Sequence, residues 1–376
     1  MKVSMHPPIG LYVHVPFCAS KCSYCDFASY PGREADIPRY VDAVIKEIRR
    51  RGTEAGHPTA DTVFLGGGTP SLLDEPQVTR ILHALFEAFP LAEGAEITCE
   101  CNPGTLTAPF AQALRMAGVN RLSLGAQAAQ ARLLRLLGRI HAWEDVIASV
   151  RIARHVGFEN INLDLMFGLP SQTIEELRES LEAAISLGPT HLACYGLIVE
   201  EGTPLCRDVT GGNLDLPDEE VERDMYELVR QVLAERGFRQ YEISNFARPG
   251  YACRHNLGCW TRVPYLGFGC AAHSFFNECR TMNPSTLDAY LAGEEATTTR
   301  VSQEEARFES MMLGLRMTRG VKEDEFVRMH GLSIREAFGD KLRASIDAGL
   351  LEWRDGALKL TRRGMDLQNS VLVDLM

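Results

Sequence analysis

The chain has 376 residues, of which 45% are hydrophobic and 24% are charged, and its formal net charge is −11. This length predicts one large or two unequal domains, and the composition excludes a disordered, collagen-like or low-complexity protein. The negative charge disfavours nucleic acid and anionic membranes as partners. No segment approaches the roughly 18 apolar residues of a membrane helix, and the first ten residues, interrupted by Pro7 and Pro8, do not resemble a signal peptide.

The eleven cysteines are an odd number in a chain without a recognisable export signal. Such usage argues against a disulfide framework. We therefore expect a cytoplasmic protein with reduced thiols, some of which hold a metal.

Strand-like and helix-like segments alternate from residue 10 to about residue 246. The predicted strands span 10–16, 61–66, 96–103, 121–127, 160–168 and 191–199, and the main helices span 39–51, 76–89, 108–118, 143–157, 171–188 and 218–237. This alternation indicates an α/β protein with βαβ crossovers and a mostly parallel sheet. Six units are too few for a closed eight-stranded barrel, which leaves a partial (β/α)6 barrel or a doubly wound sheet. Polar or glycine-rich positions at the C-terminal ends of the strands favour a partial barrel with one site at its rim.

The remaining chain differs in character. Residues 241–276 are rich in Gly, Pro, Cys, His and aromatic residues without a long period, so we expect an ordered connector over the barrel rim. Helices at 304–316, 323–330 and 334–348, then a hairpin at 350–361, predict a winged-helix-like domain. Its 12 Lys+Arg against 13 Asp+Glu disfavour DNA binding. The expected division is a barrel at 1–246, a connector at 247–300 and a C-terminal domain at 301–376.

Cys18, Cys22 and Cys25 form a CxxxCxxC triplet directly after the first predicted strand. Three thiolates so close in sequence can converge on one soft metal centre. Iron–sulfur clusters usually take four cysteine ligands, so three leave one iron open, as a catalytic site requires. A zinc site completed by Cys253 or His14 is one alternative, and three unrelated buried thiols are another.

The triplet and its place after the first strand resemble the radical S-adenosylmethionine (SAM) superfamily. Further segments resemble the HemW family of haem chaperones, which is related to oxygen-independent coproporphyrinogen III oxidase. These segments are YVHVPFC at 12–18, DF at 26–27, GGGTP at 66–70, NPGT at 102–105, GRIH at 138–141, DLMFGLP at 164–170, YEISNF at 241–246 and RHN at 254–256. The resemblance implies a barrel of radical SAM type with a 4Fe–4S cluster on the three cysteines. It also implies that the open iron binds SAM, which an electron from the cluster cleaves to a 5′-deoxyadenosyl radical.

The resemblance also implies which residues contact SAM. Gly67, Gly68 and Thr69 lie in the glycine-rich turn, where backbone amides can approach the methionyl end of the cofactor. Arg139 is expected to meet the cofactor carboxylate bidentately, with a surface ion pair as the alternative for this residue. The other positions that match cofactor contacts of the oxidase relatives are Tyr12, Tyr24, Glu100, Gln127, Asp164 and Gly196.

Two features separate the chaperones from the oxidases within this family. The oxidases carry a fourth cysteine two positions beyond the triplet, where this chain has Phe27, and a longer N-terminal arm. We therefore expect a protein that binds haem and delivers it to respiratory haem proteins, without coproporphyrinogen oxidase activity. The alternative is an active radical SAM enzyme, either a methyltransferase or a cyclopropane-forming relative. A zinc-bound scaffold with a regulatory winged domain is a third interpretation.

Haem iron is normally bound by His, Cys, Met or Tyr. The HNxxYW motif of the family is present at residues 255–260 with Cys259 in the tyrosine position, so His255 and Cys259 are ligand candidates. His273, in a loop that departs from the family but retains His-Ser-Phe, is a third candidate. A hydrogen-bonded connector is the competing interpretation of His255, and small buried thiols are that of the cysteines. Ala128-Ala129 after Gln127 is a further departure from the family pattern.

The resemblance also implies a set of partners. Haem is expected as cargo, haem-accepting proteins as recipients, including a membrane-associated one, and a flavodoxin or ferredoxin as electron donor.

Overall fold

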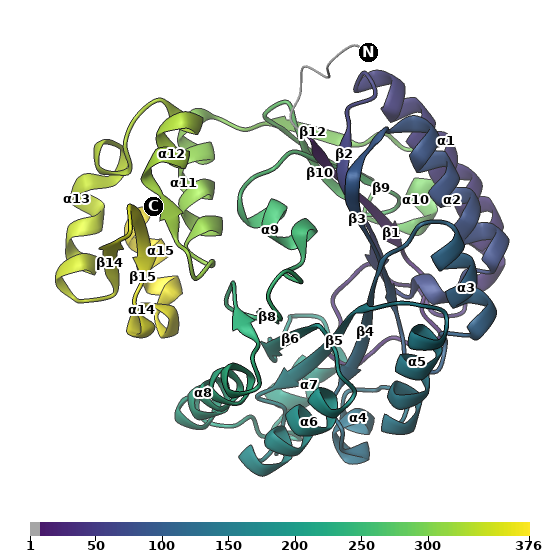
Figure 1. Ribbon diagram of the computed structural model, residues 1–376, viewed down its shortest axis with the longest axis horizontal. Helices are drawn as coiled ribbons and strands as arrows, with labels where there is room; N and C mark the ends of the chain where they lie inside the picture. The colour runs from purple at the N-terminus through teal and green to yellow at the C-terminus, as the bar shows by residue number, and fades with distance from the viewer. Residues whose placement is uncertain (1–7) are drawn as a thin grey trace.

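A computed structural model describes residues 8–376, and its main feature is an open, curved sheet of twelve strands (Figure 1). Six parallel strands occupy its centre in chain order. They are β1 (Ile9–Val15), β2 (Ala60–Gly67), β3 (Leu91–Cys101), β4 (Arg121–Gln127), β5 (Asn160–Phe167) and β6 (His191–Gly196). The predicted partial barrel is confirmed. The start of the segment assessed for a signal peptide lies outside the described residues.

Helices connect the strands, and Figure 1 shows α1, α2, α3 and α5 on the convex face of the sheet. The longer helices are α1 (Ile37–Glu54), α2 (Glu75–Ala88), α3 (Ala108–Met116), α5 (Trp143–His155), α6 (Ile174–Ser186) and α8 (Glu219–Glu235). Four shorter helical elements are too short to show a helical period in the sequence. They are η1 (Glu34–Asp36), η2 (Pro70–Leu72), α4 (Ala131–Leu136) and α7 (Pro204–Thr210). Within residues 8–376, no helix is long and apolar enough to cross a membrane.

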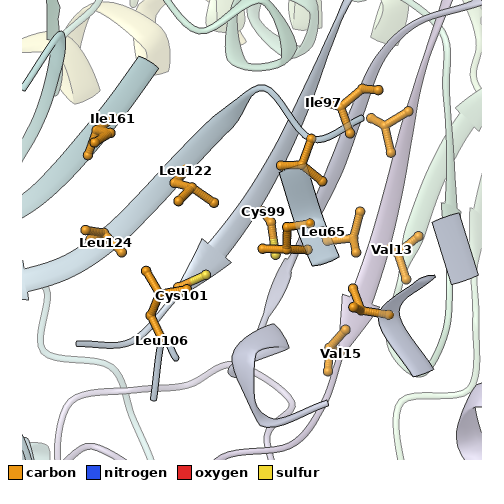
Figure 2. Packing of buried hydrophobic residues seen from close by; sticks show 14 of the residues in the cluster. Val13, Val15, Leu65, Ile97, Cys99, Cys101, Leu106, Leu122, Leu124 and Ile161 are labelled. Atoms are coloured by element: carbon orange, nitrogen blue, oxygen red, sulfur yellow. The ribbon is translucent and has the colours of Figure 1, made fainter. Parts of the chain in front are cut away.

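The two-residue side-chain period of a strand divides the central sheet into an apolar and a polar face. On the convex face, Val13 and Val15 pack with apolar side chains of the neighbouring strands beneath the helices. Figure 2 shows this packing with Leu65, Ile97, Cys99, Leu122, Leu124 and Ile161. The intervening positions point to the concave face and are largely polar or glycine. They include Tyr12, His14, Glu100, Ser123, Gly125, Gln127, Asn162 and Asp164.

Both edges of the parallel sheet are extended by further strands. At the first edge β9 (Tyr265–Phe268) pairs in parallel with β1, and β10 (His273–Phe276), β11 (Cys279–Met282) and β12 (Thr297–Arg300) follow in antiparallel pairs. At the other edge β8 (Asn245–Ala247) and β7 (Arg239–Gln240) follow β6. These strands pair backbone groups that a bare edge would leave open. Helix α10 (Leu287–Ala292) lies between β11 and β12 in the chain.

Helix α9 (Arg254–Trp260) does not cover the barrel rim, which we define as the C-terminal ends of β1–β6. It packs at the opposite end, which we call the floor. There the backbone N–H of His255 donates to Glu96, and the His255 ring bonds the Thr62 hydroxyl near the start of β2. Residues 254–260 therefore do not form the connector over the rim that the sequence led us to expect. Because β9 runs parallel to β1, the helix immediately before β9 must lie where β1 begins.

After β12 the chain forms a smaller module with its own core. Its helices are α11 (Gln303–Gly314), α12 (Glu323–His330), α13 (Ile334–Asp347), α14 (Arg362–Asp366) and α15 (Gln368–Leu375), and its sheet has β13 (Val321–Lys322), β15 (Ala357–Leu360) and β14 (Leu351–Arg354) in this order. The hairpin turns at Asp355 and Gly356, which both have positive φ, as two-residue hairpin loops require. The winged-helix-like prediction is confirmed.

An ion pair with a fully buried carboxylate ties this module to the barrel. The Glu242 carboxylate is fully buried and accepts hydrogen bonds from Ser244 N (2.8 Å), Asn245 Nδ2 (2.5 Å) and Arg316 Nη2 (3.3 Å). The Arg316 guanidinium also lies 4.6 Å from the centroid of the Trp260 ring at the end of α9. Arg316 therefore joins the C-terminal module to the β7–β8 turn and to the floor helix.

Replacing Glu242 with alanine should lower the free energy of unfolding by about 3 kcal/mol, because loss of one partner leaves a charge and two donors without an acceptor. Denaturant unfolding measures this change. Glu325→Ala is the control, since it breaks a half-exposed pair with Arg319 and should cost less than about 1 kcal/mol. Equal losses in the two variants would contradict the role assigned to Glu242.

Candidate radical SAM site

The three cysteines lie in the loop that follows β1, at the rim. Cys18, Cys22 and Cys25 are free thiols of intermediate burial. The Cys25 N–H donates to the Cys22 carbonyl (3.3 Å), and the Ser23 N–H donates to the carbonyl of Leu137 after α4 (3.0 Å). Local turns and a neighbouring helix therefore hold the loop in place.

The thiols are close enough to influence one another's ionisation. Burial raises the pKa of Cys18 and Cys25, and neighbouring thiols of the triplet raise it further. The Thr69 hydroxyl lies 3.4 Å from Cys18 Sγ, and Arg139 Nη1 donates to Cys22 Sγ at 3.5 Å. Three soft ligands in one loop, beside a hydroxyl and a cation from other segments, fit an iron–sulfur cluster, because bound iron would take the place of the thiol protons.

The two residues considered as a fourth zinc ligand are both committed elsewhere. His14 uses both ring nitrogens, Nδ1 with the Tyr12 hydroxyl (2.9 Å) and Nε2 with the Ala28 carbonyl (2.8 Å). Cys253 Sγ donates to Glu96 at the floor (3.4 Å). Neither is therefore available to complete a tetrahedral zinc site with the triplet.

The glycine-rich turn after β2 fits beside the cysteine loop only because it lacks side chains. Gly67 has a φ of +103°, and a Cβ there would lie 2.4 Å from His14 Nδ1. A Cβ at Gly68 would lie 2.6 Å from the Val15 carbonyl oxygen. Side chains at either position would displace strand β1 or its loop.

The amide groups of this turn are already used within the protein. The N–H groups of Gly67, Gly68 and Thr69 donate to Glu100, Val15 and Phe17, respectively. Binding of the cofactor by these amides, as expected from the resemblance, would require breaking these bonds.

A cavity of about 520 Å³ opens beside the cysteine loop. The three cysteines line it together with most of the predicted cofactor residues, namely Tyr24, Gly67, Gly68, Glu100, Gln127, Arg139, Asp164 and Gly196. Thr69 and Tyr12 do not line this cavity, since their hydroxyls face Cys18 and His14. Six separate strand ends thus contribute to one wall, as parallel strands with polar inner positions require.

Two carboxyl groups in this wall have raised pKa values. Burial raises the pKa of Glu100 to about 8, and the nearby Asp164 raises it further. Burial also raises the pKa of Asp164 to about 6. A 2.7 Å hydrogen bond from Asn162 Nδ2 to its carboxylate partly offsets this rise. Buried acceptors of this kind suit the hydroxyl groups of a ribose, which would satisfy them without adding charge.

Arg139 does not point freely into the cavity. Its Nη2 donates to Asn102 Oδ1 (2.9 Å) and to the Gly125 carbonyl (2.8 Å), and its Nε donates to His141 Nδ1 (3.3 Å). A bidentate contact with a cofactor carboxylate would require breaking some of these bonds. In the structure Arg139 acts first as a cation held against Cys22.

The three candidate haem ligands do not come together. His255 and Cys259 lie on α9 and line a cavity of about 210 Å³ at the floor, whereas His273 is exposed on β10. His255 is buried, its Nδ1 lies 2.8 Å from Thr62 Oγ1 and its ring stacks on Phe64. Burial lowers the pKa of His255 to about 4, so the ring is neutral at physiological pH.

Several residues of the cavity wall were not singled out from the sequence, namely Asn102, Ser123, Met166 and Tyr195. Ser123 lies four residues before Gln127 on the same strand face, so the two-residue period of β4 could have identified it. The Tyr195 hydroxyl donates to Gln127 Oε1 (2.9 Å). No sequence pattern indicates that contact, because it joins two strands that are not adjacent in the sheet.

Known proteins resemble this chain in sequence and in fold. A model of the Radical SAM superfamily matches residues 12–184, and a model of the HemN C-terminal domain matches residues 301–367. The chain is 39% identical over 367 residues to the heme chaperone HemW of Bacillus subtilis, covering 96% of this chain and 97% of that protein. It is 35% identical over 378 residues to the heme chaperone HemW of Escherichia coli, covering 97% of each. The structure of E. coli coproporphyrinogen III oxidase (HemN) superposes with a TM-score of 0.85 at 24% identity, covering 98% of this chain and 90% of that one.

The open barrel with its three-cysteine loop and adjoining cavity defines a radical SAM protein. This class implies a 4Fe–4S cluster and SAM. Within it, the chain belongs to the HemW family.

Replacing Cys22 with alanine should abolish the cluster and leave the fold intact, because the loop lies outside the hydrophobic core. Iron and sulfide content after anaerobic reconstitution, with circular dichroism for the fold, measures both. Cys279→Ala, at a half-buried thiol on β11, is the control and should retain a full cluster. A full cluster in the Cys22→Ala protein would overturn the ligand assignment.

The stability of the cluster-free and SAM-free protein should fall as the pH rises from about 5 to 8. Since the pKa of Glu100 is raised to about 8 in the folded chain, the folded state holds a proton over this range that the unfolded state has released. Glu100→Gln should remove this component, worth on the order of a few kcal/mol. Unfolding free energies measured across the range test it, and parallel pH profiles of both proteins would contradict it.

Proposed function

We propose that this protein is a haem chaperone that carries a 4Fe–4S cluster and SAM, binds haem and delivers it to haem proteins. The observation that carries the proposal is the similarity of nearly the whole chain to proteins named heme chaperones in two bacteria. That similarity extends beyond residue 184, where the superfamily match ends. It therefore includes the floor helix and the C-terminal module.

The residues around the cavity would divide the work of holding the cofactors. Cys18, Cys22 and Cys25 would hold the cluster, which supplies the electron for reductive chemistry on SAM when both are bound. The carbonyl groups of the turn at residues 66–69 would receive the amino group of SAM, and Glu100 with Asp164 would accept from its ribose hydroxyls. The remaining predicted contacts are Tyr12, Tyr24, Thr69, Gln127, Arg139 and Gly196.

The proposal excludes coproporphyrinogen oxidase activity. Phe27 stands where the oxidases have a fourth cysteine, and its side chain is 60% exposed at the cavity mouth. It offers neither a ligand nor a hydrogen bond to a porphyrinogen. The likeness to the oxidase, at 24% identity, concerns the fold alone.

We further propose His255 as the first haem ligand, with Cys259 on the same helix and His273 as weaker candidates. With Nδ1 directed to Thr62, Nε2 is the ring nitrogen that could bind iron. The cavity of about 210 Å³ beside it is smaller than the roughly 300–1,000 Å³ of a site that encloses a drug-sized ligand. Haem at this position would therefore remain partly outside the floor, or α9 would move.

The partners follow from the same proposal. Haem would pass to haem proteins, including a membrane-associated acceptor, and a flavodoxin or ferredoxin would reduce the cluster in the cytoplasm. We propose that residues 1–246, 247–300 and 301–376 form three functional parts. The buried Glu242–Arg316 pair would couple the first to the third.

Anaerobic reconstitution followed by haem titration tests the function, with 5′-deoxyadenosine and coproporphyrinogen III conversion assayed in the same sample. We expect stoichiometric haem binding, little 5′-deoxyadenosine and no conversion. Steady 5′-deoxyadenosine formation without haem binding would instead mean an active radical enzyme.

His255→Ala should weaken haem binding and change the haem absorption spectrum, because an axial ligand is lost. His83→Ala, at an exposed histidine of α2, is the control and should bind as the parent does. Cys259→Ala leaves His255 in place and should have the smaller effect. Unchanged haem titration of the His255→Ala protein would reject this ligand.

A further inference from the structure

Side chains from other segments of the barrel form hydrogen bonds with two of the three cysteine sulfurs. The Thr69 hydroxyl lies 3.4 Å from Cys18 Sγ, and Arg139 Nη1 lies 3.5 Å from Cys22 Sγ. Both groups bond the same side chain, that of Asn102, which follows β3. Asn102 Nδ2 donates to Thr69 Oγ1 (2.8 Å), and Asn102 Oδ1 accepts from Arg139 Nη2 (2.9 Å).

The chemistry of these groups fixes the direction of every bond. A guanidinium can only donate, so the amide oxygen of Asn102 must face Arg139 and its NH₂ group must face Thr69. Since the Thr69 oxygen accepts from that NH₂ group, its own proton is free for Cys18. An iron-bound thiolate has no proton and can only accept. The chain of donors therefore runs from Asn102 through Thr69 to Cys18.

The backbone around Asn102 is held as firmly as its side chain. Its N–H donates to Ser71 Oγ (3.3 Å), and its carbonyl accepts from both the N–H (3.1 Å) and the hydroxyl (2.8 Å) of Thr105. Arg139 is fixed in turn by the Gly125 carbonyl and by His141. Donors placed so rigidly keep their geometry when the charge on the sulfurs changes.

We propose that Asn102 is a positioning residue for the cluster, which directs the Thr69 proton to Cys18 and holds the Arg139 guanidinium against Cys22. Hydrogen bonds to thiolate sulfurs stabilise the more negative, reduced cluster and so raise its reduction potential. Asn102 therefore sets that potential without touching a ligand. The inference rests on a cluster bound by this loop and does not depend on haem binding.

Asn102→Asp is the sharpest test, because it changes one group and keeps the shape. The carboxylate still accepts from Arg139, but it also accepts from Thr69, whose proton then turns away from Cys18. The midpoint potential should shift to a more negative value in a redox titration of the SAM-free protein followed by electron paramagnetic resonance. The added charge alone would also lower the potential, so a second substitution must separate the two causes.

Thr69→Val removes the hydroxyl and provides that separation. By itself it should lower the reduction potential of the cluster. The control is Thr98→Val, which removes a buried hydroxyl of β3 that has no hydrogen-bond partner, and it should leave the potential unchanged. In the Thr69→Val background, Asn102→Asp should cause a smaller shift than in the parent, because only its charge remains to act. Equal shifts in both backgrounds would overturn the proposal.

Iron and sulfide content is measured first in every protein. A parent protein that assembles no cluster would overturn the ligand assignment and this inference together, which separates that failure from a loss of haem binding alone. If Asn102→Asp assembles no cluster, the two valine variants decide. A Thr69→Val potential equal to that of Thr98→Val would then overturn the proposal.

Discussion

The functional features of this protein depend on the alternation of side chains along six parallel strands. Because successive residues point to opposite faces, one set of side chains builds the core beneath the helices, and the other set faces the concave side. The parallel direction brings all six strand ends to one rim. A cysteine loop, a glycine turn and buried carboxyl groups from strands distant in sequence therefore meet around a single cavity.

Polar groups on the concave face are costly unless each has a partner, and the structure meets this requirement with long hydrogen-bonded chains. From Asp164 one chain runs through Asn162 and His191 to the Tyr241 hydroxyl. The Cys253 N–H donates to the same hydroxyl, and its thiol donates to Glu96. The cofactor wall and the floor are thus joined by continuous hydrogen bonds, so helix α9 is part of the barrel interior.

The segment YEISNF at residues 241–246 has a structural role that its sequence does not reveal. Tyr241 points to His191 inside the barrel, while Glu242 holds Arg316 of the C-terminal module. Adjacent residues of this segment therefore contact different parts of the molecule. Glu242 is fully buried. An irregular stretch with no clear periodicity therefore carries a buried polar group, because its side chains serve as contacts between parts of the molecule.

The order of strands and helices, the winged module and the cysteine triplet could be predicted from the sequence, because period, turn residues and ligand spacing are local properties. Together with the family resemblance, the sequence also indicated about half of the residues that line the cavity, since polar residues near parallel strand ends share one rim. Three features became visible only in the folded chain: His255 lies at the floor, Arg139 is held against Cys22, and Asn102 links two sulfur donors. These features depend on the pairing of β9 with a distant strand and on the directions of individual hydrogen bonds. The strand pairing and the hydrogen-bond directions depend on which of several distant residues pack together, and no local sequence pattern indicates this.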